Sequence, residues 1–319
     1  MPSEFEIIRK YFTRPAPTAL LGIGDDCALL SPRAGTTLAV STDMLLAGRH
    51  FFAGADPGKL GHKALAVNLS DLAAMGADPR WALLAIALPG ANEKWIAAFA
   101  RGFFRLARRF GVELIGGDTT RGPLAISITA IGEIPRDSAL RRDAARAGED
   151  IWLSGTTGEA ALALAHLKGR VRLRSAARKA CLARLHTPEP RVALGRRLRG
   201  LARSAIDVSD GLLADLGHVL RASGVGAELR WDELPRAQAI ASCPDRILAR
   251  DCLLAGGDDY ELLFTASRSR RARIEALGRN LGIPLARIGA TVAGRPKINL
   301  RDARGKAVSA PRAGFDHFA

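Results

Sequence analysis

The sequence predicts an α/β (α+β) protein of two mixed α/β domains. Strand-like apolar runs alternate with amphipathic helical runs along the chain, and its 319 residues exceed what one minimal core needs. A polar, basic, glycine-containing stretch, PRDSALRRDAARAGED, separates two such series. We therefore expect an N-terminal domain over residues 1–140 and a C-terminal domain over residues 141–319.

The elements of the first half follow from periodicity and from helix start and stop signals. After an amphipathic opening helix, TTLAVSTDML is typical of a strand, and PGKLGHKALAVNLSDLAAMGA of a helix that begins at Pro57 and ends near Gly76. WALLAIALP predicts the next strand, and NEKWIAAFARGFFRLARRFG predicts an amphipathic helix that ends at Gly111. The strands VELIGGD and LAISITAIGEI complete this half, and Asp118 is expected directly after VELI.

The second half repeats the mixed pattern. A strand in DIWLSGTTG precedes helices in a basic segment, and a strand at SAIDVSDG precedes a helix from Leu212 to Ala222. AELRW, YELLFTA, LARIGATV and PKINL predict further strands. We expect a second sheet with packed helices.

Composition is that of a globular protein of a reducing compartment. Hydrophobic residues form 48% of the chain, and no run approaches the ~18 apolar residues that span a bilayer. The N-terminus lacks the pattern of a secretory signal. The cysteines lie far apart without metal-ligand spacing, which is typical of isolated buried thiols: Cys27, Cys181, Cys243 and Cys252. We expect a cytoplasmic protein without a membrane partner.

The net charge of +15 is concentrated in residues 168–203, which contain twelve Lys or Arg and one acid. Ala and Leu at helical spacing favour solvated faces of two helices broken at Pro188 and Pro190, and a surface that attracts phosphates stays open as the alternative. The segment has no aromatic residue on which bases could stack, so we expect no nucleic-acid partner.

Acidic residues recur in apolar or glycine-rich settings at nearly every strand end. A carboxylate in such a setting costs several kcal/mol to desolvate unless it is paired, hydrogen-bonded or bound to a metal. A helix cap is an alternative for Asp210 and a turn for Asp25. Asn68 and Asp71 are three residues apart and therefore share one helix face. The acidic residues concerned are Asp25, Asp26, Asp43, Asp71, Asp118, Asp207, Asp210, Asp258, Asp259 and Glu261.

Carboxylates accompanied by Ser, Thr and Gly form the oxygen-rich ligand set of Mg²⁺, and phosphates are the usual companions of such ions. The common nucleotide motifs are absent from the sequence, however. There is no G-x-x-x-x-G-K-[ST] loop and no D-F-G, and GIGDD is not G-x-G-x-x-G. P-loop enzymes, protein kinases and Rossmann dehydrogenases are thereby excluded.

Seven motifs in a fixed order carry a resemblance to a known family. They are GIGDDCALL, STDMLLAGRHF, KALAVNLSDLAAMGADP, IGGDTTRGPL, IDVSDGL, GGDDYELLFT and GFDHF, and they span residues 22–318. The sequence resembles the thiamine-monophosphate kinase family, of the superfamily that includes aminoimidazole ribonucleotide synthetase and selenophosphate synthetase. The resemblance implies transfer of the ATP γ-phosphoryl group to thiamine monophosphate, and a homodimer built through the sheets of the N-terminal domains.

The resemblance also assigns residues to roles. It implies several Mg²⁺ ions bound by Asp26, Ser41, Thr42, Asp43, Asp71, Asp118, Asp207 and Asp210. It implies ATP contacts for Gly117, Arg142 and Ser209, and contacts to the thiamine substrate for His50, Asp258 and Phe315. A packed core histidine is the alternative for His50. Two departures stand out. Asp258 replaces the usual Glu and is one methylene shorter, and RDAARAGED, where the family motif is closer to R-S-G-A-x-P-G-D, lacks the first Gly and the Pro of that motif and is one residue longer before the strand.

These assignments lead to a hypothesis of direct in-line transfer. The attacking phosphate oxygen is already ionised, so we expect no general base and no covalent nucleophile. Two rival functions remain: an ATP-dependent synthetase of the same superfamily, which would release orthophosphate, and a basic nucleic-acid-binding protein that would use residues 168–203.

Overall fold

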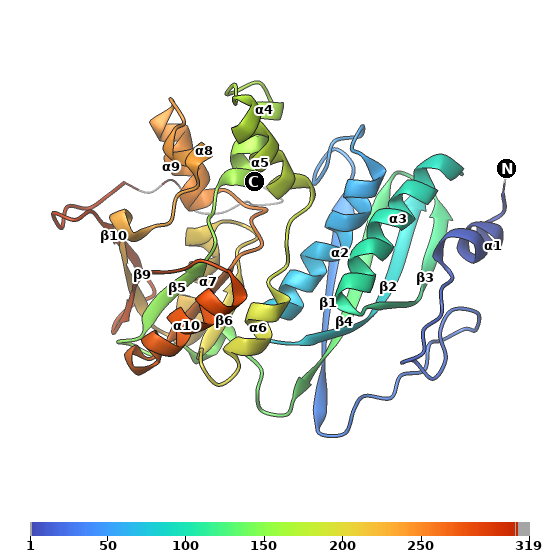
Figure 1. Ribbon diagram of the computed structural model, residues 1–319, viewed down its shortest axis with the longest axis horizontal. Helices are drawn as coiled ribbons and strands as arrows, with labels where there is room; N and C mark the ends of the chain where they lie inside the picture. The colour runs from blue at the N-terminus through green and yellow to red at the C-terminus, as the bar shows by residue number, and fades with distance from the viewer. Residues whose placement is uncertain (1, 310, 312–319) are drawn as a thin grey trace. The chain divides into compact units, whose positions relative to one another are not determined.

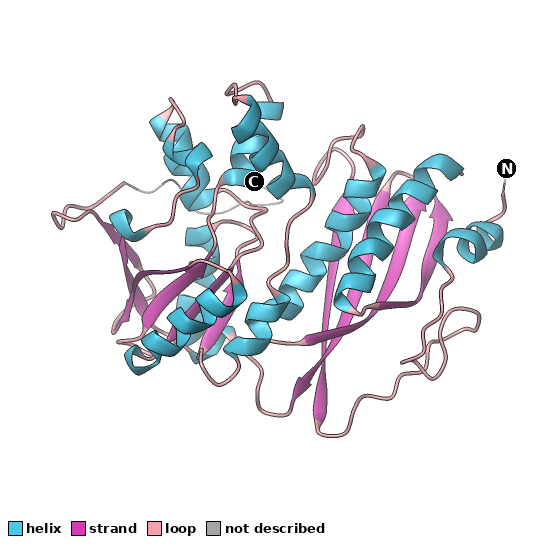
Figure 2. Ribbon diagram, in the orientation of Figure 1, coloured by secondary structure: helices cyan, strands magenta, loops and turns pink. Residues whose placement is uncertain are grey.

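The computed structural model describes residues 2–309 and 311 and contains two sheets, each with helices alongside (Figure 1). Backbone contacts divide it into an N-terminal unit (Met1–Leu72 and Ala77–Asp137) and a C-terminal unit (Ala73–Gly76 and Ser138 onward). Figure 2 shows that both units mix helices with strands, which confirms the predicted fold class. Among the described residues, no helix is both long and apolar enough to cross a membrane.

The N-terminal unit contains a four-stranded sheet in the order β1-β4-β2-β3. β1 is antiparallel to β4, β4 to β2, and β2 runs parallel to β3. Helices α2 and α3 lie across one face of this sheet (Figure 1). The elements are α1 (Glu4–Ile7), the π-helical η1 (Ile8–Phe12), β1 (Thr36–Leu46), α2 (Pro57–Ala74), β2 (Asp78–Leu88), α3 (Glu93–Phe110), β3 (Glu113–Arg121) and β4 (Ala125–Pro135).

Helices α2 and α3 cross at glycines. A Cβ at Gly102 would lie 1.8 Å from the carbonyl oxygen of Gly58, and one at Gly61 would lie 2.1 Å from that of Phe99. The backbones therefore touch directly, and the side chains of α2 between Ala64 and Ser70 are buried. The predicted end of α3 is confirmed, because Gly111 follows it in the left-handed conformation with φ 66°.

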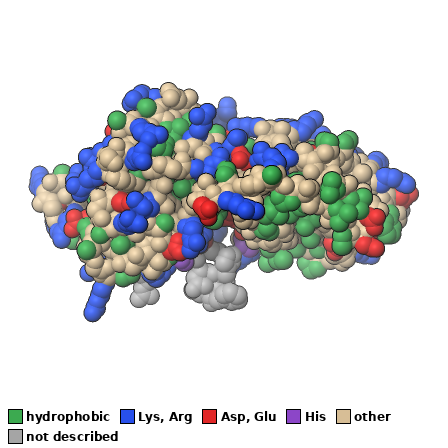
Figure 3. Space-filling model, turned by 90° about the horizontal axis from the view of Figure 1, so that it is seen from below, with side chains coloured by type: hydrophobic (Ala, Val, Ile, Leu, Met, Phe, Trp, Pro, Cys, Tyr) green, Lys and Arg blue, Asp and Glu red, His purple; other side chains and the backbone are tan. Residues whose placement is uncertain are grey.

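The other face of the sheet is open along β1, whereas residues of the preceding loop, among them Ala16 and Leu30, cover Trp81 and Ile131 on it. Along β1, side chains alternate, and Leu38, Val40, Met44 and Leu46 on the open side are between 38% and 61% exposed. Hydrophobic side chains gather over this unit in the space-filling view (Figure 3). Exposed apolar residues in a contiguous row mark an interaction surface more often than a solvated one.

The C-terminal unit contains a six-stranded sheet in the order β10-β7-β9-β5-β8-β6. Its core includes Ile151, Leu153, Ile206, Leu263 and Ile288, all at most 1% exposed. The elements are η2 (Arg142–Ala144), β5 (Asp150–Ser154), α4 (Glu159–Leu167), α5 (Ser175–His186), α6 (Val192–Leu198), β6 (Ser204–Asp207), α7 (Leu212–Ser223), β7 (Gly226–Arg230), η3 (Trp231–Glu233), α8 (Gln238–Ala241), α9 (Arg246–Ala255), β8 (Leu262–Ala266), η4 (Arg268–Arg270), α10 (Arg271–Leu281), β9 (Leu285–Val292) and β10 (Ile298–Arg301).

Three arginines of the basic segment, residues 168–203, form ion pairs with buried carboxylates. Arg184 and Arg191 both donate to the buried carboxylate of Glu261, and Arg203 donates to Glu149. The remaining cations of the segment are mostly exposed, as the solvated-face interpretation expects. Neither interpretation of the sequence anticipated these internal pairs, two of which bind α5 and the residue before α6 to Glu261, directly before β8.

Candidate functional site

In the N-terminal unit, the predicted ligands on β1 meet those on α2. The hydroxyl of Ser41 donates a hydrogen bond to the carboxylate of Asp71, and the backbone N–H of Asp43 donates to Asn68 Oδ1 over 3.1 Å. Because Asn68 and Asp71 are three residues apart on α2, both face the same stretch of strand. The structure thus brings Ser41, Asp43 and Asp71 together, and Asn68 and Asp71 share one helix face, as their spacing predicted.

Thr42 lies on the opposite, open face of the sheet, because strand neighbours alternate. Its hydroxyl lies 2.8 Å from that of Thr129 on β4. Asp118 shares this open face. It lies opposite Ala85 on β2, and Ala85 lies opposite Ser127 on β4, which is two residues from Thr129 and therefore on the same side. The sequence placed Asp118 directly after a strand, whereas it lies inside β3, exposed beside Gly117 with φ 144°.

Asp118 does not join the Ser41–Asp71 group within one copy of this unit. β1 and β3 are the two edges of the sheet, with β4 and β2 between them. Three strand spacings of ~4.8 Å separate their backbones by roughly 14 Å. Asp26 lies in an exposed loop, where its N–H donates to Asp25 Oδ1 over 2.8 Å.

His50 lies half-buried in the turn after β1. Its Nδ1 accepts the N–H of Leu46 over 3.0 Å, so in the neutral ring the proton is on Nε2. The ring is therefore held in one orientation by the backbone rather than packed in the core.

In the C-terminal unit, the motifs IDVSDG and GGDDYEL lie side by side. β6 and β8 are antiparallel with Asp207 opposite Leu262, so the chain leaving β6 runs beside the chain entering β8. The N–H of Asp258 donates to the carbonyl of Ser209 over 2.8 Å, and that of Tyr260 donates to Val208 over 2.8 Å. A Cβ at Gly257 would lie 2.3 Å from the carbonyl oxygen of Ser209, so only glycine permits this approach.

The second of these segments is strained. Asp258 and Tyr260 both have positive φ, 69° and 53°, which is uncommon for residues other than glycine and concentrates at functional sites. The Tyr260 hydroxyl donates to Asp258 Oδ1 over 2.9 Å and fixes that carboxylate. The predicted substrate residue Asp258 thus lies against the predicted nucleotide residue Ser209.

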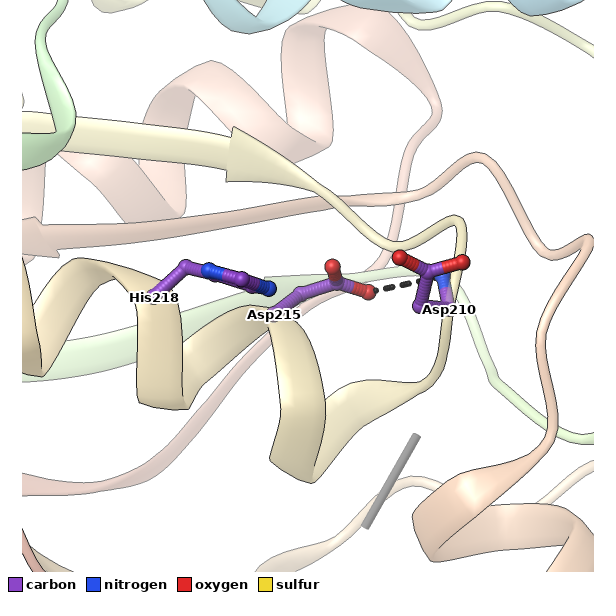
Figure 4. A group of neighbouring side chains, drawn as sticks. All are labelled: Asp210, Asp215 and His218. Atoms are coloured by element: carbon purple, nitrogen blue, oxygen red, sulfur yellow. Dashed lines mark hydrogen bonds between the residues drawn. The ribbon is translucent and has the colours of Figure 1, made fainter. Parts of the chain in front are cut away.

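The two motifs also contain or adjoin two buried carboxylates to which the sequence analysis gave no role, Asp215 and Asp259. The buried Asp215 on the first turn of α7 accepts three successive backbone N–H groups through Oδ2: from Ser209 over 3.1 Å, Asp210 over 3.1 Å and Gly211 over 3.0 Å. Burial, and then the neighbouring Asp210 carboxylate, raise the pKa of Asp215 to about 7. Asp210, Asp215 and His218 lie along one side of α7 and the preceding turn (Figure 4).

Asp259 is the second buried carboxylate to which the sequence analysis gave no role. It is 1% exposed, accepts the N–H of Gly158 over 2.8 Å, and burial raises its pKa well above the usual value. Its Oδ1 has no hydrogen-bond partner within the part of the chain that the structure describes.

Three predicted site residues remain. Asp207 is buried at the end of β6, whereas Arg142 is exposed in η2, where its carbonyl accepts the Ser223 hydroxyl over 2.8 Å. Phe315 lies outside the described residues.

Comparison with known proteins matches most of the chain to one family. The model of the AIR synthase related protein N-terminal domain matches residues 24–134, and that of its C-terminal domain matches residues 142–300. Curated relatives described as thiamine-monophosphate kinase, from Salmonella typhimurium and Escherichia coli, are each 44% identical over 99% of this chain and 98% of theirs.

Solved structures agree. The crystal structure of thiamine-monophosphate kinase from Stenotrophomonas maltophilia is 48% identical, with a TM-score of 0.85 over 95% of both chains. A structure described as AaThiL complexed with AMPPCP and TMP is 29% identical, with a TM-score of 0.77 over 90% of this chain and 89% of that one. The chain belongs to the AIR synthase related family and, within it, to the thiamine-monophosphate kinases.

Proposed function

We propose that this protein transfers the γ-phosphoryl group of ATP to thiamine monophosphate, giving thiamine diphosphate and ADP. The proposal rests on the full-length likeness to thiamine-monophosphate kinases, one of which was solved with an ATP analogue and TMP. The contact between the Ser209 loop and the Asp258 loop supports it, because the residue predicted for the nucleotide and the residue predicted for the acceptor lie on touching backbones.

Magnesium is part of the proposal. The donor set fits this ion, since carboxylates and hydroxyls are the hard oxygen ligands that Mg²⁺ prefers. Ser41, Asp43 and Asp71 are close enough to share ions on the helix side of β1, and Asp26, Thr42, Asp118, Asp207 and Asp210 complete the proposed ligand set. Bound Mg²⁺ supplies charge neutralisation between donor and acceptor phosphates.

The protein side chains have a positioning task. The acceptor phosphate is ionised at neutral pH, so no side chain has to remove a proton from it. His50 and Asp258, each held by a hydrogen bond, are the proposed contacts to the thiamine moiety, together with Phe315. Gly117, Arg142 and Ser209 are the proposed contacts to ATP. Gly117 offers backbone groups, Ser209 offers its hydroxyl, and Arg142 offers a cation on an exposed turn.

A homodimer through the N-terminal sheets belongs to the same proposal. The open face of β1 exposes Val40 by 61% and Met44 by 56%, and a second copy would cover it. Joining β1 of one copy to β3 of the other would close two sheets around these apolar faces and leave no free edge. It would also place the edge strand β3, which carries Asp118, of one copy beside β1 of the other, where Thr42 lies on the same face as Asp118.

The test is an assay with ATP, Mg²⁺ and thiamine monophosphate that measures thiamine diphosphate, ADP and orthophosphate separately, with thiamine and other phosphorylated metabolites as alternative acceptors. A kinase forms thiamine diphosphate and ADP in equal amounts. Release of orthophosphate in place of thiamine diphosphate would identify a synthetase of the same superfamily and overturn the proposal.

A further inference from the structure

The turn between β6 and α7 carries the predicted ligands Ser209 and Asp210 and directly follows a third, Asp207 at the end of β6, but little in the sequence explains what fixes its shape. The turn runs from Val208 to Gly211 and includes Gly211 at φ 122°, a conformation that other residues rarely adopt. A Cβ at Gly211 would lie 2.7 Å from the carbonyl carbon of Ala255, so the turn is pressed against the end of α9.

Asp215 is the side chain that holds this turn. Its Oδ2 accepts N–H groups from three successive residues, Ser209, Asp210 and Gly211, at 3.0 to 3.1 Å. Figure 4 shows the bond from Asp210. Three successive N–H groups aimed at one oxygen form a concave anion-binding arrangement, and here the protein's own carboxylate occupies it. Because the oxygen is already shared by three donors, the carboxylate is an internal anchor rather than a group exposed to substrate.

This anchoring determines where the backbone groups of the turn point. With the N–H groups of Ser209 and Asp210 turned inward to Asp215, the carbonyl of Ser209 turns outward and accepts the N–H of Asp258 over 2.8 Å. A single carboxylate thus fixes both the turn with the proposed metal and nucleotide residues and its contact with the proposed substrate loop.

From this geometry we propose that Asp215 is a positioning residue of the phosphoryl-transfer site, which sets the orientation of Ser209 and Asp210 toward nucleotide and Mg²⁺ without binding either. The inference rests on the proposed function. It distinguishes Asp215 from a carboxylate that only stabilises the fold, because loss of the anchoring side chain then weakens nucleotide and metal binding in a protein that is still folded.

The experiment compares wild type with Asp215→Ala, Asp215→Asn and the control Asp150→Asn. Asp150 is an equally buried carboxylate of the same unit, but it is held by Arg271 over 2.6 and 2.7 Å and has no contact with the turn. Binding of the non-hydrolysable analogue AMPPCP with Mg²⁺ is measured by calorimetry, and amide hydrogen exchange is measured for residues 209–211.

We expect Asp215→Ala to weaken AMPPCP binding, to raise the half-saturating Mg²⁺ concentration by roughly tenfold or more, and to lower kcat. Exchange at residues 209–211 should accelerate. Asp215→Asn keeps an acceptor oxygen without the charge and should fall between the two. Asp150→Asn should lower the unfolding midpoint while leaving AMPPCP affinity and the Mg²⁺ dependence at wild-type values.

Wild-type AMPPCP affinity and Mg²⁺ dependence in folded Asp215→Ala would overturn the inference. If Asp215→Ala does not fold, the same comparison is made with Asp215→Asn, and unchanged binding and exchange in that variant overturn it equally. The proposed function fails separately, if wild-type protein forms no thiamine diphosphate, because binding and exchange are still measured in that case.

Discussion

The Ser41 hydroxyl on β1 donates a hydrogen bond to the Asp71 carboxylate on α2, and the two residues are 30 positions apart in the sequence. The bond orients one carboxylate oxygen of Asp71 toward the strand, beside Asp43. Orientation by a neighbouring donor is how ligand carboxylates are held ready for a metal.

Asp71→Asn should therefore lower kcat by roughly 100-fold or more, because the proposed Mg²⁺ ligand loses its charge while its size and its hydrogen-bond acceptor remain. Ser41→Ala should have a smaller effect. Steady-state kinetics over a range of Mg²⁺ concentrations, with circular dichroism as the check on folding, measures both. Asp56→Asn at the other end of α2 is the control, since its side chain only caps the helix at Lys59, and near-normal rates for Asp71→Asn would contradict the metal assignment.

In the proposed dimer, β3 of one copy, which carries Asp118, lies beside β1 of the other, and this arrangement predicts complementation between copies. Asp71→Asn and Asp118→Asn should each be inactive alone. Co-expressed in equal amounts they should recover about a quarter of wild-type activity, because half of the dimers are hybrids and each hybrid retains one intact site. The measurement is activity of the purified mixture. If the mixture is no more active than either parent, the two residues do not come from different copies.

The open face of β1 predicts a specific route to a monomer. Val40→Glu puts a charge on a side chain that is 61% exposed in the single chain and buried in the proposed dimer, so it should halve the molar mass measured by light scattering to 33.9 kDa. Ile247→Glu, which changes a residue that is 66% exposed on the C-terminal unit, should leave the mass unchanged. A dimeric Val40→Glu variant would exclude this face as the interface.

The raised pKa of the buried Asp259 predicts that the protein loses stability as the pH rises. Its pKa is raised well above the usual value in the folded chain by burial, so on raising the pH the unfolded chain loses this proton first and the free energy of unfolding falls. Asp259→Asn stays neutral and can still accept the Gly158 N–H, while Arg184 and Arg191 remain balanced by Glu159 and Glu261.

The Asp259→Asn variant should therefore gain stability over wild type as the pH rises from about 4, with the gain levelling off above the folded pKa. Urea unfolding at pH 5 and pH 8 measures the difference. A gain that is equal at both values, or larger at pH 5, would show that the Asp259 carboxyl ionises normally in the folded protein.

The buried thiols predict selective reactivity. Burial raises the pKa of Cys181 and of Cys252 from 9.0 to about 12, and Cys243 is buried as well, whereas Cys27 is exposed. A thiol reagent at pH 8 should modify Cys27 quickly and the other three only after denaturation, because the thiolate is the reactive form. A second fast thiol in the native protein would contradict this burial.

The raised pKa values of Cys181 and Cys252 also affect stability at alkaline pH. Between about pH 9 and pH 12 these two thiols ionise in the unfolded chain but not in the folded one, so the free energy of unfolding should fall as the pH rises through this window. The double variant Cys181→Ala and Cys252→Ala should show a flatter dependence. An equal slope in both proteins would show that other groups cause the loss.

The sequence predicts the regular elements well where periodicity and end signals agree. Asn92, the apolar stripe and Gly111 define α3, and the structure places the helix at Glu93–Phe110 between them. The predicted end of the strand in VELIGGD was wrong. Its two glycines suggested that the strand breaks there, whereas β3 continues through them to Arg121. Pairing with β2 overrides the local preference of glycine for turns there.

The site is predicted less completely, for a physical reason. Motifs show which side chains are available, and on α2 the helical period also shows that Asn68 and Asp71 share a face. The role of Asp215 depends on three N–H groups whose directions exist only after the turn has folded. In the sequence it is simply an acid in the first turn of a helix, a common and uninformative feature. Asp118 likewise reveals its distance from β1 only through the strand order.

The absence of a side chain at Gly257 has a mechanical consequence. With the Ser209 carbonyl filling the space where a Cβ would be, the two neighbouring loops have no gap between them at this point, so a shift of one loop requires a shift of the other. If these loops hold nucleotide and thiamine monophosphate as proposed, a ligand that orders one loop also orders the other, and we expect the affinities for the two substrates to be thermodynamically linked.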